Sequence, residues 1–178
     1  IAAGGALALM PAGKPAAPAL APVASGWQVT DGALTFTLRQ MGSEVEGRFP
    51  DWTAAIRFDQ TPVEGRHGEV TVTIATETLT LGSVSEQAKA PEFFDSAAHP
   101  TATFTADILP EGADYVARGR LTLRGVEVPV ALPFRLVIEG DVARMEGALQ
   151  LDRRDFGMGK SYPDEASVGH AVGVKVVL

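Results

Sequence analysis

From residue 27 onward, apolar and polar residues alternate along most of the chain. Leu34, Phe36 and Leu38 alternate with polar neighbours, and the same period of two recurs at residues 70–74, 101–108, 132–139, 145–151 and 172–176. Successive side chains of a strand point to opposite faces, so this pattern predicts strands with one packed face and one solvated face. Threonine is frequent at the polar positions, as is typical of the outer face of a sheet.

Turn-forming residues separate these runs at short intervals. They are Asp31-Gly32, Met41-Gly42, Glu64-Gly65, Pro110-Glu111-Gly112, Arg124-Gly125 and Glu139-Gly140-Asp141. Short connections join antiparallel neighbours, so we expect an all-β protein with an antiparallel sheet of about eight strands. Such strands form either a sandwich or a closed barrel.

Two segments depart from the alternation. Residues 85–97 (SEQAKAPEFFDSA) contain helix formers, a cap candidate in Ser85 and two adjacent phenylalanines, and they predict a short helical insertion interrupted at Pro91. This insertion is suited to cover one barrel end. Residues 157–169 form a long glycine-containing loop before the last strand, and loops of this length in compact domains are often functional.

The first 26 residues form a separate region, which divides the chain into a head and linker (1–26) and one folded domain (27–178). Ala, Pro and Gly account for 18 of the 26 residues, and Lys14 is their only charged residue. Alternating Ala and Pro predict an extended linker. Residues 1–10 are interpreted as the end of a signal peptide, the end of a membrane-spanning helix or a disordered terminus. Either of the first two would place the domain outside the cytoplasm.

Composition narrows the function classes. The 178 residues carry a formal net charge of −7, which disfavours nucleic-acid binding, and contain no cysteine, which excludes disulfides and thiolate metal sites. The three histidines are far apart, and no nucleophile elbow, phosphate loop or zinc-protease motif occurs. The acidic pair Asp152 and Asp155 is best explained as solvated. We therefore expect neither an enzyme nor a metal site.

The chemistry that remains is apolar. We expect aromatic, leucine and methionine side chains to line the inside of the domain, while Ala102, Ala106 and Gly147 leave room between them. A fully packed barrel is the alternative. The candidate ligand-binding residues are Phe36, Leu38, Phe49, Phe93, Phe94, Phe104, Phe134, Met145, Phe156 and Met158.

Five segments, in this order, resemble the YceI family of bacterial periplasmic lipid-binding proteins. They are WQV (27–29), VEGRFPDWTAAIRFD (45–59), EFFDSAAHPTATF (92–104), LTLRGVEVPVAL (121–132) and LDRRDFGMG (151–159). The resemblance implies a lipocalin-like barrel around an apolar tunnel that binds a polyisoprenoid, a quinone or a fatty-acyl chain without catalysis. It implies a periplasmic location and no cofactor besides the bound lipid. The chain departs from the family at His99-Pro100, where Tyr-Pro is usual.

The resemblance leaves alternatives open. Some members are exported by a signal peptide, whereas others are similar to a domain fused to a cytochrome b561-type membrane protein, whose quinone this domain would then handle. A hydrolase or isomerase acting on a bound apolar substrate is a third interpretation, and a homodimer is one possible assembly. We expect Phe93, Phe94 and residues 156–169 to flank the tunnel mouth, with Arg153, Arg154 or Lys160 near a lipid head group.

Overall fold

The computed structural model describes residues 27, 29–164 and 167–178, so the expectations for residues 1–26 lie outside the described part. Among the described residues, no helix has the length and apolarity of a membrane span. The elements are β1 (Ala33–Gln40), β2 (Ser43–Arg48), β3 (Trp52–Val63), β4 (Arg66–Ala75), η1 (Thr76–Thr78), α1 (Ser85–Lys89), β5 (Thr101–Glu111), β6 (Asp114–Leu123), β7 (Val126–Glu139), β8 (Val142–Asp152), η2 (Arg153–Phe156) and β9 (Ala171–Val177).

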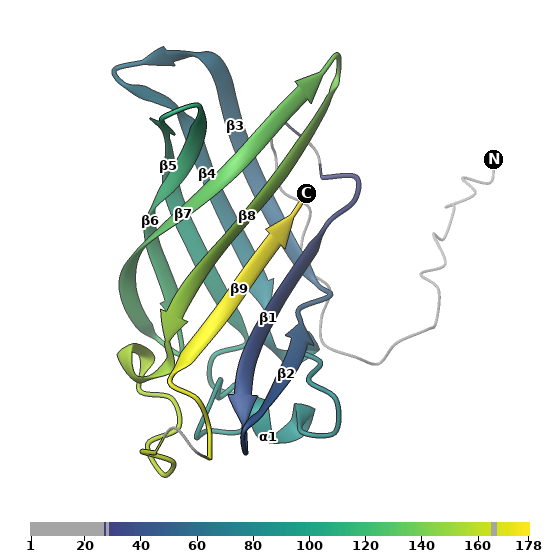
Figure 1. Cartoon of the computed structure of the whole chain (residues 1–178), viewed down its shortest axis with the longest axis vertical. Coiled ribbons are helices and arrows are strands. Elements are labelled where there is room, and N and C mark those ends of the chain that lie inside the picture. The colour runs from purple at the N-terminus through teal and green to yellow at the C-terminus, as the bar shows by residue number, and fades with distance from the viewer. Residues whose placement is uncertain (1–26, 28, 165–166) are drawn as a thin grey trace, which may run out of the picture.

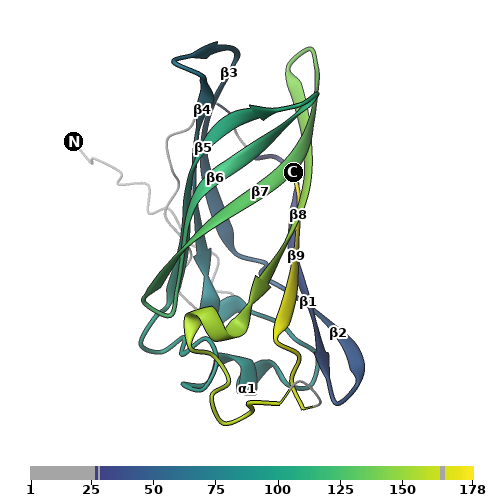
Figure 2. The ribbon, with the colours of Figure 1, turned by 60° about the vertical axis from the view of Figure 1, so that its left-hand side comes forward.

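The strands form one antiparallel sheet that curls into a barrel. Their order is β2-β1-β9-β8-β7-β6-β5-β4-β3, so all neighbouring strands are consecutive in sequence except β1 and β9, which pair with each other. Figures 1 and 2 show the strands tilted around a common axis, with α1 and the loop before β9 at one end. The all-β antiparallel prediction is confirmed, with nine strands in place of about eight. β2 is the shortest of the nine strands, and its polar sequence hides its alternation.

Tight turns set the register of three hairpins. Met41-Gly42, Glu64-Gly65 and Arg124-Gly125 each have positive φ at both residues. Two successive residues of positive φ are typical of the two-residue turns that match the twist of the flanking strands. Glycine takes the second place because it adopts positive φ at little cost.

The two edge strands of the sheet, β2 and β3, are not joined by a ladder among the described residues. Beside this gap, the segment before β1 bonds to β3, where Trp27 N donates to Ile56 O (3.3 Å), and the segment after β2 stays bonded to β1, where Phe49 N donates to Leu34 O (3.0 Å). Trp52 begins β3 beside this junction. The barrel is therefore closed here by connecting segments and not by a continuous pair of strands.

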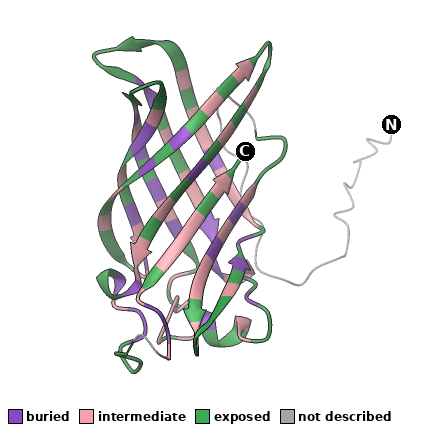
Figure 3. Ribbon diagram, viewed as in Figure 1, coloured by how far each residue is buried: buried purple, intermediate pink, exposed green. Residues whose placement is uncertain are grey.

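The inner row of side chains explains why a cavity remains. Figure 3 shows buried and intermediate residues alternating with exposed residues along the strands. Many inward-facing residues are only half-buried, among them Val72, Met145, Leu149 and Val174. In a solid core such side chains would lose nearly all of their accessible surface. Their remaining surface faces space inside the barrel.

The insertion at residues 85–97 is helical only in its first part. α1 ends at Lys89, before Pro91, and turns follow it. Ser85 is not the N-cap, because Val84 occupies that position; the Ser85 hydroxyl instead accepts from Leu81 N and donates to Gly82 O. The hydroxyl therefore fixes the turn that leads into the helix.

We predict that Phe156→Ala destabilises the domain strongly. Phe156 is 2% exposed in η2 and packs in the main core cluster. Removing a buried phenylalanine ring costs about 3–5 kcal/mol. Chemical denaturation monitored by circular dichroism measures the loss, and Val142→Ala, at a residue that is 57% exposed, is the control. Equal stability of the two variants would contradict the assigned packing.

Candidate functional site

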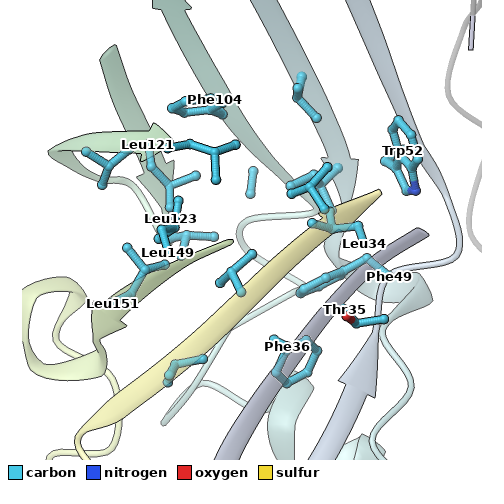
Figure 4. A pocket seen from close by; sticks show the side chains of 18 of the residues that line it. Leu34, Thr35, Phe36, Phe49, Trp52, Phe104, Leu121, Leu123, Leu149 and Leu151 are labelled. Carbon is cyan, nitrogen blue, oxygen red and sulfur yellow. The ribbon is translucent and has the colours of Figure 1, made fainter. Parts of the chain in front are cut away.

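The barrel encloses one elongated apolar cavity of about 320 Å³. This volume falls in the range of about 300–1,000 Å³ that is usual for small-molecule sites. In Figure 4, Leu34, Phe36 and Phe49 face Leu121, Leu149 and Leu151 across the open space. These residues come from β1, the segment after β2, β6 and β8, so opposite walls of the barrel contribute to one surface.

All ten candidate residues from the sequence line this cavity. Strands contribute five of them, and the segment after β2, the insertion and the region after β8 contribute the others. They are Phe36, Leu38, Phe49, Phe93, Phe94, Phe104, Phe134, Met145, Phe156 and Met158. Their contact with a ligand remains a prediction.

Polar residues are rare in the lining. Asp31, Thr35, Gln40, Gln87 and Arg153 are the polar side chains among those that line the cavity. Thr35 reaches the lining although the alternation assigns it to the outer face. The cavity can therefore satisfy few hydrogen bonds, and an apolar ligand fits its chemistry.

Two segments distant in sequence cover one barrel end together. The backbone N–H of Gly159 donates to Glu92 O at 2.8 Å, and the rings of Phe93 and Tyr162 stack with centroids 5.9 Å apart. Beneath them, Phe94 packs against Phe49, with ring centroids 5.5 Å apart. The insertion and the loop thus lie at the same end, as Figure 1 shows, but they form a packed cover over it.

Arg153 organises this cover. Its side chain is 5% exposed, and its five N–H groups donate to five backbone carbonyls at 2.5–3.1 Å. The acceptors are Gly169, Met158, Gly159, Tyr162 and Val168. Because every donor is used, Arg153 has none left for a lipid head group, and the expectation of that contact is corrected. It stabilises the loop that precedes β9.

The other two cations proposed for a head group lie further from the cavity. Arg154 forms an ion pair with Asp152 (Nη2 to Oδ2, 2.6 Å), and Lys160 is exposed. Neither lines the cavity. The Arg154 guanidinium, by hydrogen bonding to Asp152, lowers the pKa of that carboxyl to about 2. Asp152 also accepts a bond from Arg154 N and so caps η2.

The opposite half of the barrel narrows at an aromatic cluster. Phe58 stacks on His67 with centroids 5.6 Å apart, and Tyr115 stacks on Phe134 at 5.8 Å. The two stacks meet edge to face, with His67 and Tyr115 5.0 Å apart. Phe58 and Phe134 line the cavity, whereas His67 and Tyr115 do not. The cluster therefore ends the cavity along this part of the wall.

Sequence reasoning missed part of the lining. Val72, Val130, Leu149 and Val174 line the cavity, although alternation alone would assign them to an ordinary core. The period of two identifies the inner face but does not say whether that face meets another wall or open space. The role of Arg153 was also missed, because its partners are backbone carbonyls, which carry no residue-specific signal.

No cluster of three or more metal-ligating His, Cys, Asp or Glu side chains occurs within the described ranges. The geometry there is that of a binding cavity.

Sequence comparison matches residues 27–178 to the family model of the YceI-like domain. The chain belongs to the YceI-like family. A UPF0312 protein of Pectobacterium carotovorum subsp. carotovorum is 31% identical over 61% of this chain, which spans 57% of that relative's length. A UPF0312 protein of Pseudomonas aeruginosa is 27% identical over 70% of each chain.

Solved structures of the family share the barrel. The crystal structure of Burkholderia cenocepacia BcnA matches with a TM-score of 0.76 and 27% identity, covering 82% of this chain and 94% of that one. The Campylobacter jejuni YceI protein matches with a TM-score of 0.64 at 20% identity, over 76% of this chain and 84% of that one. The lipocalin-like barrel expected from the sequence resemblance is therefore confirmed.

We predict a pH-dependent contribution of Asp152 to stability. Its folded-state pKa is lowered from 3.8 to about 2, so the stabilising contribution is complete above 3.8 and is lost as the pH falls toward 2. The difference in unfolding free energy between wild type and Asp152→Asn should therefore shrink over this interval. Urea denaturation at a series of pH values measures it. A difference that stays constant down to pH 2 would contradict the prediction.

Proposed function

We propose that this protein binds a long apolar lipid inside the barrel and carries or stores it without chemical change. The ligand is an isoprenoid-type lipid: a polyisoprenoid, a quinone with an isoprenoid tail or, failing these, a fatty-acyl chain. The observation that carries the proposal is the continuous apolar cavity of about 320 Å³ between opposite walls of the barrel. Membership in the YceI-like family supports it.

The energetics favour a chain-like ligand. Burial of apolar surface contributes about 25 cal/mol per Å², so each hundred Å² of a lipid tail contributes roughly 2.5 kcal/mol. Burial of several hundred Å² of tail surface therefore offsets the free-energy cost of association, even without a specific polar contact. The half-buried side chains of the inner wall supply this surface, and the cavity needs no large rearrangement to present it.

The lining favours binding over catalysis. Its polar side chains include no Ser, Cys, His or Lys, and Asp31 and Arg153 belong to opposite ends of the barrel. Arg153 has all its donors occupied. General acid–base or nucleophilic catalysis requires such groups within hydrogen-bond reach of each other.

The proposed location is the periplasm, by export or by a membrane tether, and it rests on the apolar Ala- and Pro-rich head. A second candidate function is the handling of quinone for a cytochrome b561-type membrane partner, which the same head favours. Mass spectrometry of an organic extract of the purified protein distinguishes the two. A quinone supports the partner, whereas a polyisoprenol or a fatty acid supports a general carrier, and no lipid at any loading concentration contradicts both.

We predict that Val72→Trp abolishes most lipid binding while the barrel still folds. Val72 is half-buried and lines the cavity, so an indole there occupies space that the lipid needs. The affinity for a fluorescent polyene fatty acid should fall at least about tenfold, which corresponds to roughly 1.4 kcal/mol. Fluorescence titration measures it, with far-UV circular dichroism as the folding check.

Thr71→Trp is the matched control for this variant. Thr71 neighbours Val72 on β4 but is exposed on the outer face. The same indole there should leave affinity unchanged. Equal affinities of both variants and wild type would show that the probe binds outside the barrel.

A further inference from the structure

The barrel wall contains a seam between β7 and β8. These strands pair only from Phe134↔Gly147 to Glu139↔Val142. Residues 126–133 of β7 pair only with β6, and residues 148–152 of β8 pair only with β9. Figure 2 shows the two strands diverging toward the covered end, where η2 lies against β7. Over this stretch of the described chain, no strand ladder joins the two walls.

The sequence of β7 accounts for the seam. Pro129 and Pro133 both lie in the unpaired stretch, four residues apart, and each lacks a backbone N–H. The ladder with β6 continues through both, at Arg120↔Pro129 and Val116↔Pro133. Alternate residues of a strand direct their hydrogen-bonding groups to opposite neighbours, so both prolines present their missing donors toward β8. Two of the donors that a β7–β8 ladder would need are absent.

The side chains at the seam are apolar and belong to the cavity. Val130 and Leu132 on β7 and Leu149 and Leu151 on β8 all line it. Apolar contacts lack the directionality of hydrogen bonds and can re-form around an inserted alkyl chain. Separation of these strands would therefore break no ladder bond, unlike separation of any fully paired strands in the wall.

One cation fastens the wide end of the seam. Arg124, in the β6–β7 turn, donates through Nη1 to Gly157 O, just beyond η2, and through Nη2 to Pro91 O at 2.8 Å. Its φ is +55°, a conformation that residues other than Gly, Asn or Asp seldom adopt. The turn thus holds an arginine where Gly, Asn or Asp would be less strained, and the Arg124 guanidinium connects the β6–β7 hairpin to both segments of the cover.

We propose that the lipid tail enters and leaves the barrel sideways through the β7–β8 seam, with Arg124 as the residue that holds the seam closed. This inference rests on the proposed lipid-binding function. An end-on route would require the tail to be threaded along the whole barrel axis. The seam instead opens the side of the cavity between Val130 and Leu132 on β7 and Leu149 and Leu151 on β8 once the hydrogen bonds of Arg124 break.

The first test compares Arg124→Ala with Arg120→Ala. Loss of the charge-assisted bonds should speed uptake and release of a fluorescent polyene fatty acid by about tenfold each, with the dissociation constant little changed. Arg120 is the matched control, since it lies on the same hairpin but pairs with exposed Glu127 on the outer surface. Stopped-flow fluorescence measures the rates, and circular dichroism confirms folding.

The second test locks the seam, which the absence of cysteine makes simple. Cysteines replace the exposed residues Ala131 on β7 and Ala148 on β8, and bismaleimides of increasing length link them. The control pair, Thr71→Cys and Thr105→Cys, spans the paired β4–β5 wall. Linking across the seam should slow uptake at least about tenfold, whereas linking the control pair should not.

The outcomes separate the two proposals. If wild type does not bind the probe at all, the proposed function fails. If wild type binds it, yet neither Arg124→Ala nor the seam cross-link changes the rates relative to the controls, the seam proposal is overturned and entry is end-on.

Discussion

The nine-stranded wall of this barrel encloses more space than its own side chains fill. The hydrogen bonds of the ladders set the circumference of the barrel, and the inward residues, mostly valine, leucine, phenylalanine and alanine, do not reach across it. The unfilled space is apolar on nearly all sides, so water gains little there and an alkyl chain gains much. The lipid-binding proposal follows from this mismatch between circumference and side-chain volume.

The two barrel ends and the wall close this cavity in different ways. At one end, Arg153 holds the loop before β9 in a packed cover by donating all five of its N–H groups to backbone carbonyls. Toward the other end, the cluster around His67 and Tyr115 narrows the interior. In the wall, Pro129 and Pro133 remove two of the backbone donors that β7 would direct toward β8. The fold thus keeps the cavity covered while one part of the wall is held by side chains alone.

Much of the architecture was predictable from the sequence. Antiparallel strands with one solvated face show an alternation of apolar and polar residues, and X-Gly pairs mark the turns of the hairpins. The helical insertion was predicted where this alternation stops, and the ten candidate residues, all of which line the cavity, were chosen for their aromatic, leucine and methionine side chains. Other features were not accessible. The alternation of Val72 or Leu149 is the same in a hollow and in a solid barrel, and the role of Arg153 depends on carbonyls that any sequence supplies. Locating the seam requires knowing which residues of β6 and β8 pair with β7, and the sequence pattern does not supply this register.

The most direct measurement is methyl NMR of the protein, labelled at valine and leucine, during titration with a long-chain fatty acid. If the ligand lies inside the barrel, the inward methyls of Val72, Leu149 and Val174 should show chemical-shift changes and ligand contacts, while those of exposed Val137 and Val142 stay unchanged. Shifts confined to the exposed valines, or no shifts at saturating ligand, would contradict it.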